Sequence, residues 1–153
     1  MKYTVEQSWF AHFFTVDKAS APLWFLVRLY VGYEFFMAGW DKLASPAWYG
    51  SDAGAALQGF VQGALGKTGG AHPDVYQWYA SFLQSTVLPH LVAWSNAVVF
   101  GEILIGLGLI VGLCTGTAAF FAFFMSFNFM LAGTVSINPV LILLAIGIML
   151  AYR

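Results

Sequence analysis

Charged residues are scarce in this chain of 153 residues: Asp, Glu, Lys and Arg together make up 8% of it. A soluble globular domain contains about 25% of such residues. Because hydrophobic residues reach 60%, the composition excludes an ordinary soluble domain and predicts an all-α integral membrane protein. A net charge of −1 offers no basic face, so we expect no nucleic-acid partner.

Cysteine is nearly absent as well. The single residue, Cys114, excludes an internal disulfide, a CxxC redox pair and a cysteine-ligated cluster within the chain. The three histidines, His12, His72 and His90, do not form a pair within an apolar run, which argues against bis-histidine haem ligation. We therefore expect no bound metal or haem.

The chain instead contains long apolar runs. The first, residues 22–40, is about 28 Å long as a helix, close to the hydrocarbon thickness of a bilayer. Three more runs cover residues 92–113, 116–133 and 139–152. They predict a single domain over residues 1–153, a four-transmembrane-helix bundle. Gly108, Gly112 and Gly116 have the small-xxx-small spacing that lets a neighbouring helix come close.

The longest polar region, residues 41–91, predicts an outer loop with two short interfacial helices. The first follows Ser51 and Asp52, which are good N-cap residues, and ends in the glycine-rich stretch 66–70. The second begins after Pro73 and repeats apolar residues at helical spacing. Since long loops without structure are uncommon, we expect this segment to cover the bundle as a cap.

Basic residues give the orientation. Lys2, Lys18 and Arg153 lie on the terminal side of the spans, against Lys42 and Lys67 in the long loop. The positive-inside rule then favours cytoplasmic termini and an outward loop. The predicted location is the cytoplasmic (inner) membrane, crossed several times.

Three charged residues fall inside the apolar runs, where each costs about 2.5–3.5 kcal/mol on insertion scales. Counted from the outer ends of their helices, Glu102 lies about 14 Å deep and Arg28 about 18 Å deep, so we expect these two to pair. Glu34 is then the less compensated carboxylate, expected to be protonated at rest and able to exchange a proton. The alternative is an ion pair that joins two helices and has no chemistry.

Polar and aromatic residues near the outer rim extend this candidate site. Trp40, Trp48 and Trp94 are placed to line an entry for a flat ring, although packing against lipid explains them equally well. Asn128 and Ser126 have the simpler alternative of hydrogen bonds to a neighbouring helix.

Three segments carry a family resemblance: RLYVGYEFFMAGWDKL at 28–43, GEILIGLGLIVGLCT at 101–115 and NFMLAGTVSINP at 128–139. In this order they resemble the DoxX/DoxD membrane family, most closely its branch of thiosulfate:quinone oxidoreductase large subunits. That branch implies a four-helix protein that takes electrons from thiosulfate, passes them to a membrane quinone and works with a separate small subunit. The matching polar positions are Arg28, Trp40, Lys42, Glu102, Asn128 and Asn138. The role of Glu34 rests on the depth argument alone.

Quinone reduction takes up two electrons and two protons, which gives the internal polar residues their expected roles. Arg28 and Asn128 are expected to donate hydrogen bonds to a quinone carbonyl, and Glu102 or Glu34 to relay protons. Lys42, with His90 and the amide of Asn138, is the candidate for binding the thiosulfate dianion at the outer mouth.

The partners expected from this interpretation are the lipid bilayer, a quinone, a small anionic sulfur substrate, a small redox subunit and further copies of the chain. Two other functions stay open. One is a non-catalytic scaffold that holds a soluble redox partner; the other is a small proton-coupled transporter that uses its membrane carboxylate. Turnover without a partner separates an enzyme from a scaffold.

Overall fold

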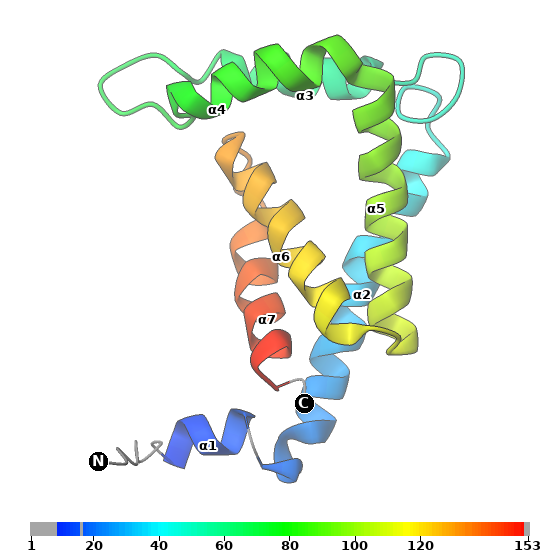
Figure 1. The fold of residues 1–153 in the computed structure, drawn as a ribbon, viewed down its shortest axis with the longest axis vertical. Helices are drawn as coiled ribbons and strands as arrows, with labels where there is room; N and C mark the ends of the chain where they lie inside the picture. Colours follow the sequence, from blue (N-terminus) through cyan, green and yellow to red (C-terminus); the bar gives the residue numbers. More distant parts are fainter. Residues whose placement is uncertain (1–8, 16, 152–153) are drawn as a thin grey trace, which may run out of the picture.

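A computed structural model describes residues 9–15 and 17–151, and within these ranges the protein is helical and has no strand. Four long helices form the bundle: α2 (Ala21–Leu43), α5 (Leu91–Val111), α6 (Thr115–Leu131) and α7 (Asn138–Ala151). They lie within a few residues of the four predicted apolar runs. The short helix α1 (Trp9–Thr15) and the last turn of α7 both lie at the end of the bundle opposite the cap (Figure 1).

Helices α2 and α5 pack closely because glycines remove side chains between them. A Cβ atom on Gly106 would lie 2.6 Å from both the Cβ and the amide nitrogen of Phe36, and one on Gly39 would lie 2.9 Å from the amide nitrogen of Ile103. Of the predicted glycine series 108, 112 and 116, Gly108 does lie at a close helix contact, since a Cβ there would be 3.1 Å from the Ala118 Cβ on α6. Gly112 instead ends α5 in the left-handed conformation, at φ 82°.

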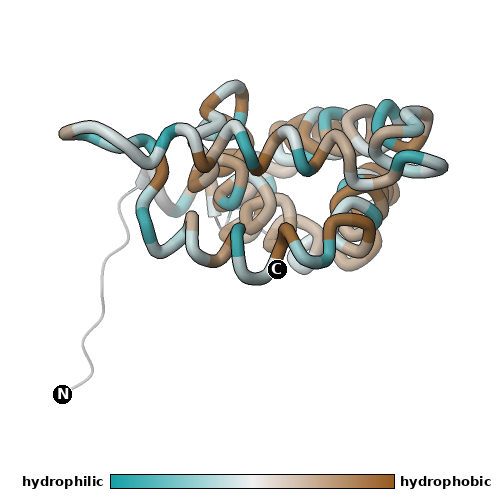
Figure 2. Tube along the Cα trace, turned by 90° about the horizontal axis from the view of Figure 1, so that it is seen from above, coloured by the Kyte–Doolittle hydropathy of each residue, from teal (hydrophilic) through white to brown (hydrophobic). Residues whose placement is uncertain are grey.

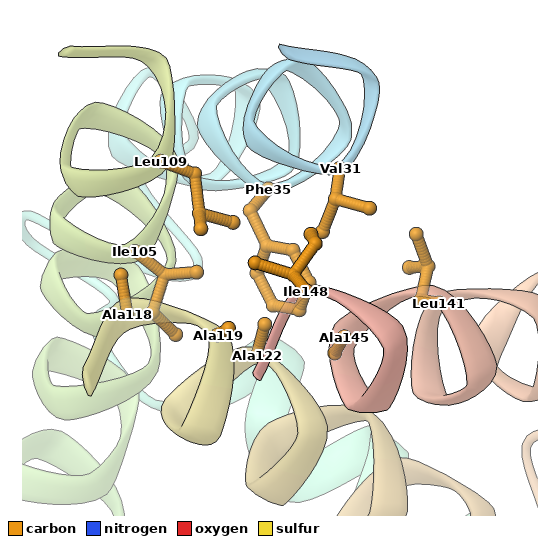
Figure 3. Close-up of a cluster of buried hydrophobic side chains, with 10 residues drawn as sticks. All are labelled: Val31, Phe35, Ile105, Leu109, Ala118, Ala119, Ala122, Leu141, Ala145 and Ile148. Atoms are coloured by element: carbon orange, nitrogen blue, oxygen red, sulfur yellow. The ribbon is translucent and has the colours of Figure 1, made fainter. Parts of the chain in front are cut away.

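The four long helices share one apolar core (Figure 3). Alanines on α6 and α7 keep these two helices close together, and larger side chains from α2 and α5 fill the remaining space. The buried residues of this core are Val31, Phe35, Ile105, Leu109, Ala118, Ala119, Ala122, Leu141, Ala145 and Ile148.

The cap contains α3 (Ala55–Leu65) and α4 (Gln77–Phe82), which lie across one end of the bundle (Figure 1). Both short helices were predicted, but their first residues were not. The N-cap of α3 is Gly54 rather than Ser51 or Asp52. A Cβ on Gly54 would lie 3.0 Å from the Leu91 Cβ, and its φ of 98° suits glycine.

Seen from above, the cap alternates between hydrophilic and hydrophobic residues (Figure 2), as expected for helices with one buried face. The buried face of α3 consists of Leu57, Val61 and Ala64. Two cap residues, Lys67 and Tyr79, donate hydrogen bonds to α6 and to the turn that follows it. Lys67 Nζ donates to the Gly133 carbonyl at 2.7 Å, and the Tyr79 hydroxyl donates to the Asn128 carbonyl at 3.1 Å.

One continuous helical stretch of the described chain, Gln77–Val111, is long and apolar enough to cross a membrane. It bends sharply where the cap meets α5, at the 3₁₀ turn Leu88–His90 (Figure 1). Pro89 lies in this turn and explains the bend, because its ring prevents a regular helix from continuing. Helices α6 and α7 are apolar and shorter. That all four helices cross a membrane stays a prediction.

Candidate functional site

The centre of the candidate site is an ion pair between α2 and α5. Lys42 Nζ donates to both carboxylate oxygens of Glu102, at 2.8 and 3.0 Å, and Glu102 is 2% exposed. Lys42 also donates to the Ala38 carbonyl at 3.4 Å, so its side chain folds back along α2, in the direction that side chains take on a helix. These three acceptors use all three N–H groups of the ammonium.

The predicted pairing of Arg28 with Glu102 is wrong. The guanidinium of Arg28 contacts Gly112 at the far end of α5, about 15 Å along that helix from Glu102. It also lies 5.4 Å from the centre of the Phe25 ring. Arg28 therefore takes no part in the site around Glu102.

The error came from the alignment of the two helices. The outer ends of α2 and α5 were expected to lie at one level, whereas Gly39 in fact faces Ile103. In this antiparallel alignment, α5 begins about eight residues, or about 12 Å, beyond the end of α2. The additional turns of α5 carry the cap (Figure 1), and they bring Glu102 to the level of Lys42.

A cavity of about 270 Å³ adjoins the ion pair. We call it the polar pocket. It lies between α2, α5, the start of α7 and the turn that joins α6 to α7. Its lining comprises Glu34, Phe35, Ala38, Lys42, Trp48, Phe60, Glu102, Phe129, Thr134, Ser136, Ile137, Asn138 and Leu141.

Glu34 is the second carboxylate of the polar pocket. It lies two turns before Lys42, with Ala38 between them on one face of α2. Among the residues that the structure describes, no hydrogen bond or ion pair is found for Glu34. The pocket thus contains one carboxylate held by a lysine and one that is free to bind a ligand.

The turn before α7 supplies uncharged polar groups. Asn138 is 8% exposed and donates one amide hydrogen to the Thr134 carbonyl at 3.0 Å, which leaves its second amide hydrogen and its oxygen for other partners. Ser136 adopts a φ of 39°. Thr134 and Ser136 were not predicted as site residues, although both belong to the segment 128–139 that carries the family resemblance.

The other predicted binding residues lie outside the polar pocket. Trp40 is 53% exposed and stacks on Phe36, with ring centres 5.9 Å apart. His90 is exposed at the start of α5. Neither lines the polar pocket.

Trp94 and Asn128 line a second, larger cavity of about 780 Å³, which we call the apolar chamber. It lies between α5 and α6 beneath the cap. Asn128 donates to the Phe124 carbonyl at 2.8 Å and accepts from the Tyr79 hydroxyl at 3.2 Å. The bond from Tyr79 on α4 is the hydrogen bond to a neighbouring helix that was the simpler alternative for Asn128.

The sequence model of the DoxX family matches residues 23–136. The chain belongs to the DoxX family. The match begins in α2 and ends in the turn before α7, so it includes Glu34, Lys42 and Glu102, while Asn138 follows it. Membership of DoxX agrees with the apolar composition in identifying a membrane protein. No curated protein and no solved structure matches the chain.

The charges of the polar pocket limit what this DoxX protein can bind there. Lys42 is the only cation among the described residues that line it, and it is already bonded to Glu102. A dianion would therefore find no unpaired positive charge there. Among residues 9–15 and 17–151, no group of three or more His, Cys, Asp and Glu side chains could hold a metal ion. The pocket is best suited to an uncharged ligand that exchanges protons and accepts hydrogen bonds.

Proposed function

We propose that this DoxX protein is the quinone-reducing membrane component of an oxidoreductase that takes electrons from thiosulfate or another small sulfur donor. The observation that carries the proposal is the polar pocket, in which Glu34 lies beside the Lys42–Glu102 ion pair. A quinone ring is uncharged, accepts hydrogen bonds at its carbonyl oxygens and takes up protons when it is reduced.

The overall reaction assigns each proton and electron. Two thiosulfate ions lose one electron each and join through a new sulfur–sulfur bond to form tetrathionate. The quinone takes up those two electrons and two protons to form the quinol. Glu34 delivers the protons, because no hydrogen bond or ion pair is found for it among the described residues, whereas Glu102 already accepts two hydrogen bonds from Lys42.

Hydrogen-bond donors in the turn before α7 orient the ring. The second amide hydrogen of Asn138 and the hydroxyl of Ser136 belong to residues that line the pocket. A donor at the carbonyl oxygen stabilises the negative charge that develops there during reduction.

Thiosulfate is oxidised outside the polar pocket, on the cap side or on a separate small subunit. The support for this is electrostatic: Lys42 is neutralised by Glu102, so a dianion gains little in the pocket. This interpretation replaces the direct role in thiosulfate binding that was expected for Lys42, His90 and Asn138.

In this proposal α2, α5, α6 and α7 cross the cytoplasmic membrane and the cap faces outward. The apolar character of the helices and the DoxX match support it. The two carboxylates of the pocket, Glu34 and Glu102, are then shielded from lipid by the helices around them.

The test is quinone reduction by the purified protein in nanodiscs, with thiosulfate as donor, with and without any small subunit that purifies with it. We expect turnover in at least one of these samples and a loss of about 100-fold or more in Glu34→Gln, the usual effect of removing a proton-transfer group. The matched control is Asp41→Asn, an exposed carboxylate on the same helix that does not line the pocket. Absence of turnover in both samples, or equal rates in the two variants, would contradict the proposal.

A further inference from the structure

We infer that the apolar chamber holds the hydrocarbon tail of the quinone while its ring occupies the polar pocket, with the contact of Phe60 and Phe129 at the boundary that the chain crosses. This inference rests on the proposed function and adds a second binding site to it. Four features of the structure support it.

The first feature is the shape of the chamber. Its lining follows α5 from Trp94 to Val111, which is about 25 Å of helix. Its volume of about 780 Å³ is spread along that length, so the chamber is elongated, as a hydrocarbon chain is.

The second feature is the chemistry of the lining. No Lys, Arg, Asp or Glu is among the residues around the chamber. Its two polar groups nearest the cap, the Tyr79 hydroxyl and the Asn128 amide, bond to each other at 3.2 Å. A phospholipid headgroup would find no cation there, and Lys42 in the adjoining pocket is bonded to Glu102. An amphiphile with an uncharged head meets neither difficulty.

The third feature is the connection between the two cavities. Phe60 from α3 and Phe129 from α6 are the only residues that line both. Their rings meet edge to face, with centres 6.0 Å apart and planes at 81°. The polar pocket, at about 270 Å³, falls below the range of about 300–1,000 Å³ typical of sites that enclose a complete drug-sized ligand. It has room for a ring, and the tail extends into the chamber at the two phenylalanines, whose rings must turn apart to admit it.

The fourth feature is the way in. Large apolar side chains on both sides of the chamber are exposed, among them Leu104 at 68%, Phe121 at 49% and Phe124 at 50%. They lie along α5 and α6, the helices that the proposal embeds in the bilayer. A lipophilic molecule can thus enter sideways from the hydrocarbon region without crossing water.

The test uses a variant that narrows the chamber and asks whether it weakens binding of the tailed quinone alone. Ala97 is exposed and lines the chamber, so Ala97→Phe adds a ring to it without disturbing a buried contact. The matched control is Ala93→Phe, one turn earlier on α5, where the side chain is exposed and lines neither cavity. Equilibrium binding to each protein in detergent is measured by calorimetry for a decyl-substituted benzoquinone and for the same ring without a tail.

We expect Ala97→Phe to weaken binding of the decyl compound by about tenfold or more, which is the effect of losing about two buried methylene groups. Binding of the tail-less ring should stay unchanged. Ala93→Phe should change the affinity for neither compound. Equal weakening of both compounds in Ala97→Phe, or an unchanged preference for the decyl compound, would overturn the inference.

Because this assay measures binding without turnover, its result is independent of the proposed reaction. Tail-dependent binding in a protein that never reduces quinone would contradict the proposed function and support the chamber. Quinone turnover, together with an unchanged preference of Ala97→Phe for the decyl compound, would support the proposed function and contradict the role of the chamber. Native mass spectrometry adds two outcomes that overturn the inference: a retained phospholipid that the decyl compound cannot displace, or a dimer that Ala97→Phe dissociates.

Discussion

Lys42 and Glu102 lie 60 residues apart in the sequence and are joined by two hydrogen bonds of 2.8 and 3.0 Å. The lysine comes from the last turn of α2 and the glutamate from the middle of α5. One contact therefore fixes the alignment of these helices, forms one wall of the polar pocket and decides which carboxylate of that pocket is free.

Removing only the lysine should be costly. Lys42→Met leaves Glu102 buried without its countercharge, and we expect the protein to lose about 3–5 kcal/mol of stability. The double variant Lys42→Met with Glu102→Leu should recover most of that loss, because no unpaired charge remains. Thermal unfolding in detergent, followed by circular dichroism, measures both. A double variant as unstable as the single one would show that the lysine acts through other contacts, such as the face of Trp48, 5.3 Å from Nζ.

A methyl group at Gly106 should separate α2 from α5. In Gly106→Ala the new Cβ would lie 2.6 Å from the Phe36 backbone and Cβ, and we expect a destabilisation of about 1–3 kcal/mol from overpacking. Gly63→Ala in α3 is the matched control. No heavy atom lies within 4 Å of the Cβ that it would add, so it should gain up to about 1 kcal/mol of helix propensity. Equal unfolding temperatures for the two variants would refute the close packing of α2 on α5.

Loss of the Tyr79 hydroxyl should loosen the cap. Tyr79→Phe removes the bonds to the carbonyl and the side-chain oxygen of Asn128, at a cost of about 0.5–1.5 kcal/mol. Hydrogen exchange should rise in α4 and stay unchanged in α7. Ser81→Ala is the control, since that hydroxyl bonds only to the Gln77 carbonyl within α4. The same rise in both variants would mean that the cap does not depend on this link.

The proposed orientation can be tested with the native cysteine. Cys114 is exposed in the turn between α5 and α6, at the end of the bundle away from the cap. In intact spheroplasts a membrane-impermeant maleimide should leave Cys114 unlabelled. It should label His72→Cys, placed in the exposed cap loop in a Cys114→Ser background. The opposite labelling pattern would show that the cap faces the cytoplasm.

The sequence was sufficient for the helices and for a buried charge at Glu102, because apolar length and a charge within it can be identified from a single chain. It was insufficient for the partner of that charge. Which residue faces Glu102 depends on the alignment of α2 with α5, and contacts such as Gly106 on Phe36 determine that alignment. Lys42 was also assigned to the rim, although its side chain folds inward toward Ala38.

The two cavities could not be predicted from the sequence for a similar reason. Phe60 and Phe129 are separated by most of the cap and by α5, and each by itself is one of many aromatic residues. Only the folding of the cap over the bundle brings their rings together. The predicted role of Glu34 remains a prediction, although the structure does give it a place in the pocket.

The cap is only one helix thick above the polar pocket, because Phe60 on α3 lines that pocket while Gln58 and Gln62 on the same helix are exposed. An electron donor resting on the outer side of α3 would thus be about 10 Å, one helix diameter, from the pocket. Electrons can cross such a gap by tunnelling in a single step. In the proposed reaction, this thin cover takes the place of a chain of redox centres inside the protein.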